Sequence, residues 1–255
     1  MAPTGHIALS LDTLVFGERL QASVREMDAA LRATSTVASV NYGVTGAALF
    51  DAQGRCLAMT VSDPLIFASV RIAPRALIDA FVFDLEDGDV LMANHPDYGG
   101  VAPTIVTIVA PVIVDAQYAG AAAVQYRLAD LGGDLPGGWN MGATEWLAEG
   151  IALPPVKIVR AGRKAFDVWD MLQLNSREPA DLAWNLDAAL GACRIGAEQI
   201  KRLVQHWGSA GFERLSTDYL AYTGRLCRTL LGVVSSPATA EEEAVVVLPD
   251  GSLVR

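Results

Sequence analysis

The sequence predicts a mixed α/β (α+β) fold in which β-hairpins and a central buried sheet pack against long amphipathic helices. Apolar residues recur with helical spacing in several segments, and runs rich in Val, Ile and Ala lie between those segments. Short turns containing Asp, Gln or Gly join some of these runs, which is typical of hairpins. Because 52 % of the 255 residues are hydrophobic and 19 % are charged, the chain can bury a sizeable core.

Helical periodicity predicts helices over 11–32, 181–206 and 212–231. The first carries an apolar stripe made of Leu20, Val24, Met27 and Leu31. The second carries the clearest stripe, made of Leu182, Leu186, Ala189, Cys193, Ala197, Ile200 and Val204. Gly208 and Gly211 are expected to end it. A further helix is expected over 70–83, broken or started near Pro74.

Strands are predicted between these helices. Residues 47–61 read as a hairpin around the turn Asp51-Ala-Gln-Gly54. Residues 105–114 form a nearly continuous apolar run, as expected for a strand buried on both faces, and 115–117 turn it into 118–125. We predict one domain over 1–234, followed by a linker and a truncated hairpin tail over 235–255.

Composition excludes several classes of function. The net charge of −10 argues against nucleic acid and anionic membrane as partners. No apolar stretch is long enough for a membrane span, and the N-terminus lacks the pattern of a secretory signal, so a cytoplasmic location is expected. Three distant cysteines suggest neither zinc nor disulfides, and Cys193 is expected in the core. Nucleotide-binding, hydrolase-elbow and zinc-protease motifs are absent from the sequence.

Two polar, glycine-bearing turns stand out, each attached to an apolar run: Asn94-His-Pro-Asp-Tyr-Gly-Gly100 (the first turn) and Tyr126-Arg-Leu-Ala-Asp-Leu-Gly-Gly133 (the second turn). Such turns are a usual place for binding groups held on a rigid scaffold. His95 with Asp97 would supply a general base or a ligand pair, or His95 would bond only to the backbone of its turn, the role we favour.

Two further acidic residues have alternative roles. Asp130 would act as a residual ligand, or it would accept backbone N–H bonds beside Gly132 and Gly133, which is the commoner role of an acid there. Glu145 would orient a neighbouring loop or cap a helix-like segment over 143–149, and capping is favoured.

These two turns, followed by 143–150 and by Leu153-Pro-Pro-Val-Lys-Ile158, resemble the hydantoinase B/oxoprolinase family, which includes large subunits of ATP-dependent ketone carboxylases. The resemblance extends from about Asp12 to about Leu231 and implies the N-terminal part of that family's fold. Metal-binding His and Asp residues of the family correspond here to Ala102 and Ile105, and its His-His-Ala-Asp corresponds to 127–130, where only the last acid is kept. The resemblance therefore implies that this chain holds no metal.

The resemblance further implies a subunit of a heteromeric ATP-dependent amidohydrolase or ketone carboxylase, with a degenerate site and a structural or regulatory role. It implies that a hydantoinase A-like partner handles ATP, and that a catalytic or C-terminal hydantoinase B-like chain holds any divalent metal. The substrate-binding residues expected on the two turns and beside them are Asn94, Tyr98, Gly99, Gly100, Arg127, Gly132, Gly133 and Glu145.

Two alternatives remain. In one, the chain is itself catalytic and uses His95, Asp97 and Asp130 as an altered site for a cyclic amide or a ketone. In the other, it is a stand-alone small-molecule binding module whose 127–146 loops form a pocket. Such a binding module would be monomeric without a partner, whereas a subunit of a heteromeric enzyme separated from its partners would expose apolar surface.

Overall fold

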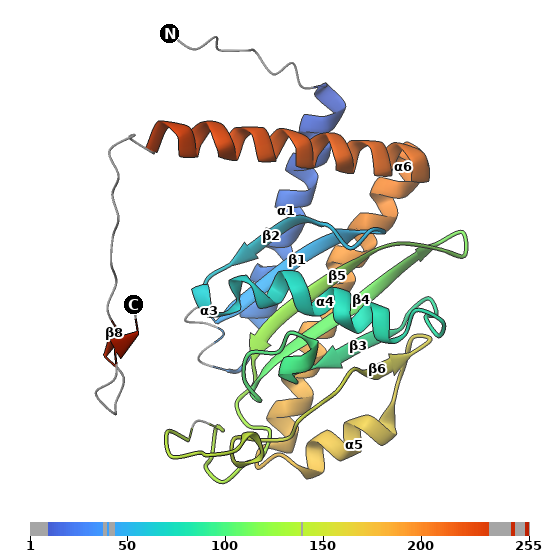
Figure 1. Cartoon of the computed structure of the whole chain (residues 1–255). Helices are drawn as coiled ribbons and strands as arrows, with labels where there is room; N and C mark the ends of the chain where they lie inside the picture. The colour runs from blue at the N-terminus through green and yellow to red at the C-terminus, as the bar shows by residue number, and fades with distance from the viewer. Residues whose placement is uncertain are drawn as a thin grey trace. The chain divides into compact units, whose positions relative to one another are not determined.

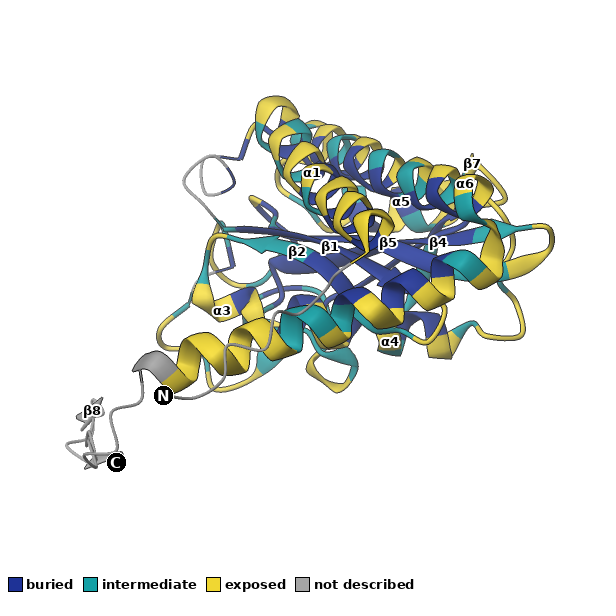
Figure 2. Cartoon of the chain, turned by 90° about the horizontal axis from the view of Figure 1, so that it is seen from above, coloured by how far each residue is buried: buried dark blue, intermediate teal, exposed yellow. Residues whose placement is uncertain are grey.

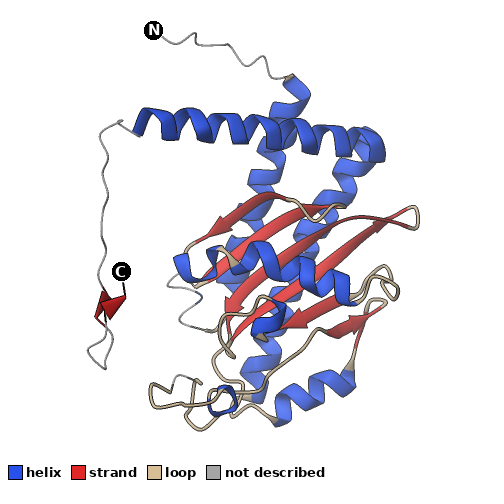
Figure 3. Cartoon of the chain, in the orientation of Figure 1, coloured by secondary structure: helices blue, strands red, loops and turns tan. Residues whose placement is uncertain are grey.

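The computed structural model describes residues 10–37, 40, 44–138, 140–234, 246–247 and 253–254. Its main unit, Ala8–Tyr219, is built on one seven-stranded antiparallel sheet of order β2-β1-β5-β4-β3-β6-β7 (Figures 1 and 3). The strands are β1 (Thr45–Asp51), β2 (Cys56–Val61), β3 (Val90–Ala93), β4 (Ile105–Val114), β5 (Gln117–Arg127), β6 (Val156–Arg160) and β7 (Arg163–Lys164). The mixed α/β fold predicted from the sequence is confirmed.

Helices cover both faces of this sheet (Figure 2). They are α1 (Leu11–Thr34), α3 (Pro64–Phe67), α4 (Ser69–Ala80), α5 (Phe166–Leu174) and α6 (Pro179–Val234), with short 3₁₀ turns η1 (Pro96–Tyr98) and η2 (Trp146–Ala148). Helix α1 and the part of α6 before Gly208 lie on one face, and α4 lies on the other (Figure 2).

Small residues let the helices approach the sheet closely. A Cβ atom built on Gly196 of α6 would lie 2.5 Å from Met27 Sδ and 2.8 Å from Ala122 Cβ. On the opposite face, Ala121 and Ala123 of β5 pack in the cluster that α4 covers. Only small side chains at these positions allow such contact, which explains the alanine-rich sequence of β5.

The apolar stripe predicted for the first helix is buried in α1, where Leu20, Val24, Met27 and Leu31 have no exposed surface. Cys193 is likewise fully buried, as predicted. The expected stop at Gly208 takes the form of a kink, because Gly208 has non-helical backbone angles (φ 71°, ψ 162°) between two helical stretches of α6.

Two element boundaries were predicted wrongly. Helix α4 starts at Ser69 and continues through Pro74, because burial of its apolar face offsets the hydrogen bond that proline cannot donate. Strand β5 continues through Tyr126 and Arg127, which were expected in the second turn. Pairing of Tyr126 with both Thr45 and Val106 extends the strand.

The second unit comprises 1–7 and 220–255. Its described parts are the end of α6 and the strands β8 (Val246–Val247) and β9 (Leu253–Val254), which pair antiparallel as a hairpin. The predicted linker over 235–243 lies outside the described residues, and the division into 1–234 and 235–255 stays a prediction. Among the described helices, none combines the length and apolar character needed to cross a membrane.

Candidate functional site

The loops that carry the predicted site residues all leave the sheet at the same end. Thr45 pairs with Tyr126, Ile105 pairs with Arg127, and Met92 pairs with Val156. The start of β1, the ends of β3 and β5, and the starts of β4 and β6 therefore lie side by side. We call this the loop end of the sheet; both polar turns and the 145–153 segment lie there.

Asn94 is the most buried residue of the first turn. Its side-chain amide donates to the carbonyl oxygens of Pro103 (2.6 Å) and Ile151 (2.9 Å), and its Oδ1 accepts from the Leu153 N–H (2.7 Å). With no exposed surface, Asn94 ties the first turn to two other segments. Its side chain joins loops and faces no solvent, so it is placed to support a site rather than to touch a substrate.

Close backbone approach fixes the rest of the first turn. A Cβ atom on Gly100 would lie 1.7 Å from the Asn94 carbonyl oxygen, which only glycine tolerates. Gly99 adopts a left-handed conformation (φ 82°), and Ser69 Oγ donates to its carbonyl oxygen. Behind Ser69, the fully buried Gln125 donates to Ser69 Oγ (2.6 Å) and to Thr107 Oγ1 (2.8 Å). Sequence analysis did not identify this supporting network.

His95 and Asp97 are the residues of the first turn whose polar side chains reach solvent. The Nδ1 atom of His95 accepts from the Asp97 N–H (3.3 Å), which makes His95 the N-cap of η1, and lies 3.7 Å from the Asp97 carboxylate. The side chains of His95 and Asp97 are 35 % and 83 % exposed. Tyr98 and Trp146 flank the imidazole, with ring centroids at 6.3 and 6.0 Å. His95 thus bonds to the backbone of its turn and keeps access to solvent.

Asp130, in contrast, is surrounded by donors. One carboxylate oxygen accepts from the N–H groups of Gly132 and Arg177 (both 3.0 Å), and the other accepts from the Gly137 N–H (3.1 Å) and Arg177 Nη1 (2.9 Å). Burial raises the pKa of this carboxyl, but these hydrogen bonds together lower it below its ordinary value. Asp130 is therefore ionised and fixes the second turn to the segment before α6.

The remaining residues of the second turn also form loop contacts. Gly132 and Gly133 have positive φ, and a Cβ atom on Gly133 would lie 2.7 Å from the Ala148 carbonyl oxygen. Arg127 Nη2 donates to the Gly137 carbonyl (3.3 Å), and burial lowers the pKa of this guanidinium. Arg177, which sequence analysis did not single out, also donates to the Gly133 carbonyl (2.6 Å). No local signal marks its pairing with an acid so far away in the chain.

Glu145 occupies the N-cap position of η2, but its side chain makes no capping hydrogen bond and is exposed. The capping role favoured from the sequence is wrong, since the segment forms only one 3₁₀ turn. Trp139, which follows Gly137 and Gly138 in the sequence, lies outside the described residues. The Trp146 indole N–H is buried and has no hydrogen-bond partner among the described residues.

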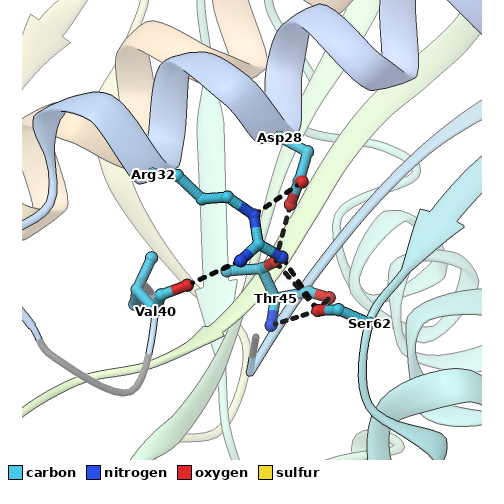
Figure 4. Close-up of polar contacts among 5 residues, drawn as sticks. All are labelled: Asp28, Arg32, Val40, Thr45 and Ser62. Atoms are coloured by element: carbon cyan, nitrogen blue, oxygen red, sulfur yellow. Dashed lines mark hydrogen bonds and ion pairs between the residues drawn. The ribbon is translucent and has the colours of Figure 1, made fainter. Parts of the chain in front are cut away.

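A second polar cluster at the loop end also escaped sequence analysis (Figure 4). Arg32 donates to the Asp28 carboxylate (2.7 Å), to Thr45 Oγ1 (2.5 Å), to Ser62 Oγ (2.9 Å) and to the Val40 carbonyl (3.0 Å). Thr45 Oγ1 donates in turn to the other Asp28 oxygen (2.6 Å). The cluster ties α1 to the start of β1 and the end of β2, and its signal in the sequence is the i, i+4 spacing of Asp28 and Arg32.

The two turns do not fit a divalent metal. Within the part of the chain that the structure describes, no three His, Cys, Asp or Glu side chains converge as a metal site would require. The carboxylate of Asp130, the one acid kept from the family pattern, already accepts four hydrogen bonds. What the two turns share with the family pattern is thus their loop geometry, which is set by glycines, Asn94 and Asp130.

Comparison with known proteins tests that resemblance. The family model described as hydantoinase B/oxoprolinase matches residues 10–254. The chain belongs to the hydantoinase B/oxoprolinase family. The resemblance stated from the two turns is therefore confirmed.

Relatives within the hydantoinase B/oxoprolinase family include the caprolactamase subunit beta of Pseudomonas jessenii, 29 % identical over 213 residues, which cover 83 % of this chain and 37 % of that subunit. The crystal structure of the ATP-dependent caprolactamase from P. jessenii superposes with a TM-score of 0.80 at 27 % identity, over 88 % of this chain and 39 % of that one. A nucleotide-free structure of acetone carboxylase superposes with a TM-score of 0.75 over 81 % of this chain and 28 % of that one; at 15 % identity it shows the fold alone.

The chain thus spans about two fifths of the length of the caprolactamase chain that it matches.

Proposed function

We propose that this chain is a subunit of a heteromeric ATP-dependent enzyme that hydrolyses cyclic amides, and that its role there is structural or regulatory. The observation that carries the proposal is Asp130. Both carboxylate oxygens are taken up by main-chain N–H groups and by Arg177, so the acid kept from the family pattern builds a loop and has no free lone pair to offer a metal.

The amide substrate class and the heteromeric assembly are suggested by the caprolactamase subunit beta, whose name specifies both a lactam and a subunit. Ketone carboxylation is the less favoured reaction, because the acetone carboxylase is similar only in fold. In the proposed complex a hydantoinase A-like subunit handles ATP, and a hydantoinase B-like chain with its His and Asp ligands holds the metal. A cytoplasmic location belongs to the same proposal.

The test is to tag the chain in its own host, purify it gently, and measure the native mass and composition of what is recovered. Recovery with an ATP-hydrolysing subunit and a larger chain that retains the metal ligands supports the proposal. Recovery of this chain without another polypeptide overturns it and favours the stand-alone binding module.

A second candidate function is supported by the exposure of His95. Unlike Asp130, this side chain is partly open to solvent. Its Nδ1 accepts from the Asp97 N–H, so the backbone of the turn orients the imidazole as a candidate base, and the Asp97 carboxylate lies 3.7 Å away. In this candidate the chain is itself catalytic. Retained turnover of the purified complex after His95→Ala would exclude it. Loss of turnover in both His95→Ala and His95→Asn, with an unchanged assembly, would replace the structural role with a catalytic one.

A further inference from the structure

The two outer strands of the sheet differ in a way that bears on association. At one side, β7 has two residues, Arg163 and Lys164, both basic, and Lys164 Nζ bonds to Asp187 (2.7 Å). Short, basic edge strands are a common way in which proteins prevent edge-to-edge pairing. This side of the sheet is thus protected.

At the other side, β2 lacks that protection. Its six residues, Cys-Leu-Ala-Met-Thr-Val, contain no charge and no proline. Within the described part of the chain β2 pairs with β1 alone, and it forms the outer strand in Figures 2 and 3. A bulge at Leu57 interrupts the register, which leaves Ala58–Val61 as the regular part of this edge.

The direction of the main-chain groups follows from one hydrogen bond. Ser62 N–H donates to the Thr45 carbonyl of β1 (3.2 Å), so Ser62 points toward β1. Because main-chain groups alternate in an antiparallel pair, Thr60 and Ala58 point the same way. The N–H and C=O groups of Met59 and Val61 therefore point outward, away from β1, where another strand would accept and donate hydrogen bonds.

The side chains beside this edge are apolar on one face. Met59 and Val61 are half-buried and pack against the cluster covered by α4. A cavity of about 330 Å³ lies next to them, lined by Val61, Ser62, Asp63, Pro64 and Phe67. Phe67 is 49 % exposed. An incoming strand would thus find main-chain partners on β2 and a place for one long side chain beside it.

We infer that β2 pairs antiparallel with β2 of a second copy of this chain, with Thr60 of each copy on the two-fold axis. In this register Met59 of one copy pairs with Val61 of the other at two places related by the axis. The outward N–H and C=O groups of these four residues are then all hydrogen-bonded. The register also places each Met59 side chain beside the cavity next to Val61 of the other copy, and a flexible thioether suits an irregular space.

Charge favours a second copy in this orientation. Arg55 precedes β2 and Asp63 follows it. Arg55 already pairs with Asp51 of its own copy (2.6 Å), but antiparallel pairing keeps the two Asp63 carboxylates at opposite ends of the interface, whereas parallel pairing would place them together. The strand itself is uncharged, so two copies meet without repulsion although each carries a net charge of −10. The interface is isologous and closes as a dimer.

The test uses the full purified chain, with sedimentation velocity over a range of concentrations. Wild type is expected to dimerise. Thr60→Lys and Thr60→Asp each place two like charges in contact on the axis, so each variant alone is expected to weaken the dimer by at least about tenfold. An equimolar mixture of the two is expected to recover the dimer, which only folded variants paired at this position would do.

A cross-link gives an independent measurement. Opposed residues at a two-fold axis of this kind lie within the Cα distance that a disulfide requires, so Thr60→Cys in a Cys227→Ser background should oxidise rapidly to a covalent dimer. Arg163→Cys, on the protected edge, is the matched control and should remain monomeric. Burial raises the pKa of Cys56 to about 11, so its thiol reacts slowly and adds little background.

A monomeric wild type at tens of micromolar (roughly the range in which weak dimers form) overturns the inference. So does a dimer that persists in both charged variants, or equal oxidation of Thr60→Cys and Arg163→Cys. The inference is independent of the proposed function: recovery from the host as a homodimer alone would support pairing through β2 and overturn the heteromeric role.

Discussion

The first and second turns lie at the same end of the sheet, yet their polar residues are used differently. In the second turn Asp130 is buried and accepts four hydrogen bonds, and in the first turn Asn94 takes the equivalent buried role with three. His95 and Asp97 lie in the first turn as well, but their side chains are open to solvent.

This difference distinguishes residues that hold the loops together from residues that could take part in chemistry, which the sequence pattern does not separate. Asn94 and Asp130 match the family pattern, and both are fully engaged in hydrogen bonds within the fold, to main-chain groups and, for Asp130, also to the Arg177 side chain. The family's His and Asp positions that correspond to Ala102 and Ile105 carry no polar group here. The loop framework thus persists without the groups that bind a metal, and His95 is the side chain left to test for chemistry.

Asn94→Ala should give the largest loss of stability. The substitution leaves two carbonyl oxygens and the Leu153 N–H without partners in a buried site, which costs about 3 kcal/mol in the free energy of unfolding. Asn140→Ala is the matched control, because that side chain makes one exposed hydrogen bond to Gly142 N–H and should cost about 0.5 kcal/mol. Urea unfolding measures both, and equal losses would contradict the central role of Asn94.

Asp130→Asn should cost about 2 kcal/mol at pH 7, because the ion pair with Arg177 is lost from a buried site. The pKa of Asp130 is lower in the folded state than its ordinary value near 4. Its contribution is therefore fully present above that ordinary value and is lost as the pH falls through the folded-state pKa. The difference between wild type and variant should stay constant from about pH 7 to 5 and shrink below about pH 4.

Asp79→Asn provides the comparison for Asp130→Asn. Asp79 pairs with Arg75 on the surface, where both side chains are more than half exposed, so its removal should leave the unfolding curve unchanged. If the two variants lost equal stability, or if the loss in Asp130→Asn did not depend on pH, the four hydrogen bonds would not be the source of the stability of the second turn.

Sequence reasoning predicted the long elements well, because periodicity reports burial directly. The stripe in α1 and the apolar run of β4 both face the core as expected. It failed where tertiary contacts override local preference: α4 passes through Pro74, and β5 extends into residues that read as a turn. Helix α5 was missed, since its short stretch Phe166–Leu174 buries only Trp169 and Leu172.

For the site, sequence reasoning located the two turns but not the residues that hold them. Glycines and an acid mark a turn locally, whereas Arg177 and Gln125 reach it from distant segments. The direction in which a side chain points is also set by packing. Asn94, expected to contact a substrate, is buried and hydrogen-bonded to two other segments, whereas His95 beside it is partly exposed.

Of the substitutions at Asn94, Asp130 and His95, His95→Ala should have the smallest effect on stability, and it therefore gives the cleanest test of chemistry. The side chain contributes one N-cap hydrogen bond, to the Asp97 N–H at 3.3 Å, so its loss should cost about 0.5 kcal/mol. His95→Asn keeps a side-chain oxygen that can cap η1 but removes the imidazole. For a structural subunit, the purified complex should turn over at the wild-type rate with either variant. If His95→Ala slows turnover and His95→Asn restores it, the capped turn is what the complex needs. If both variants abolish turnover while the assembly and its unfolding curve are unchanged, the imidazole itself takes part in the reaction, and the first turn, unlike the second, is a catalytic element.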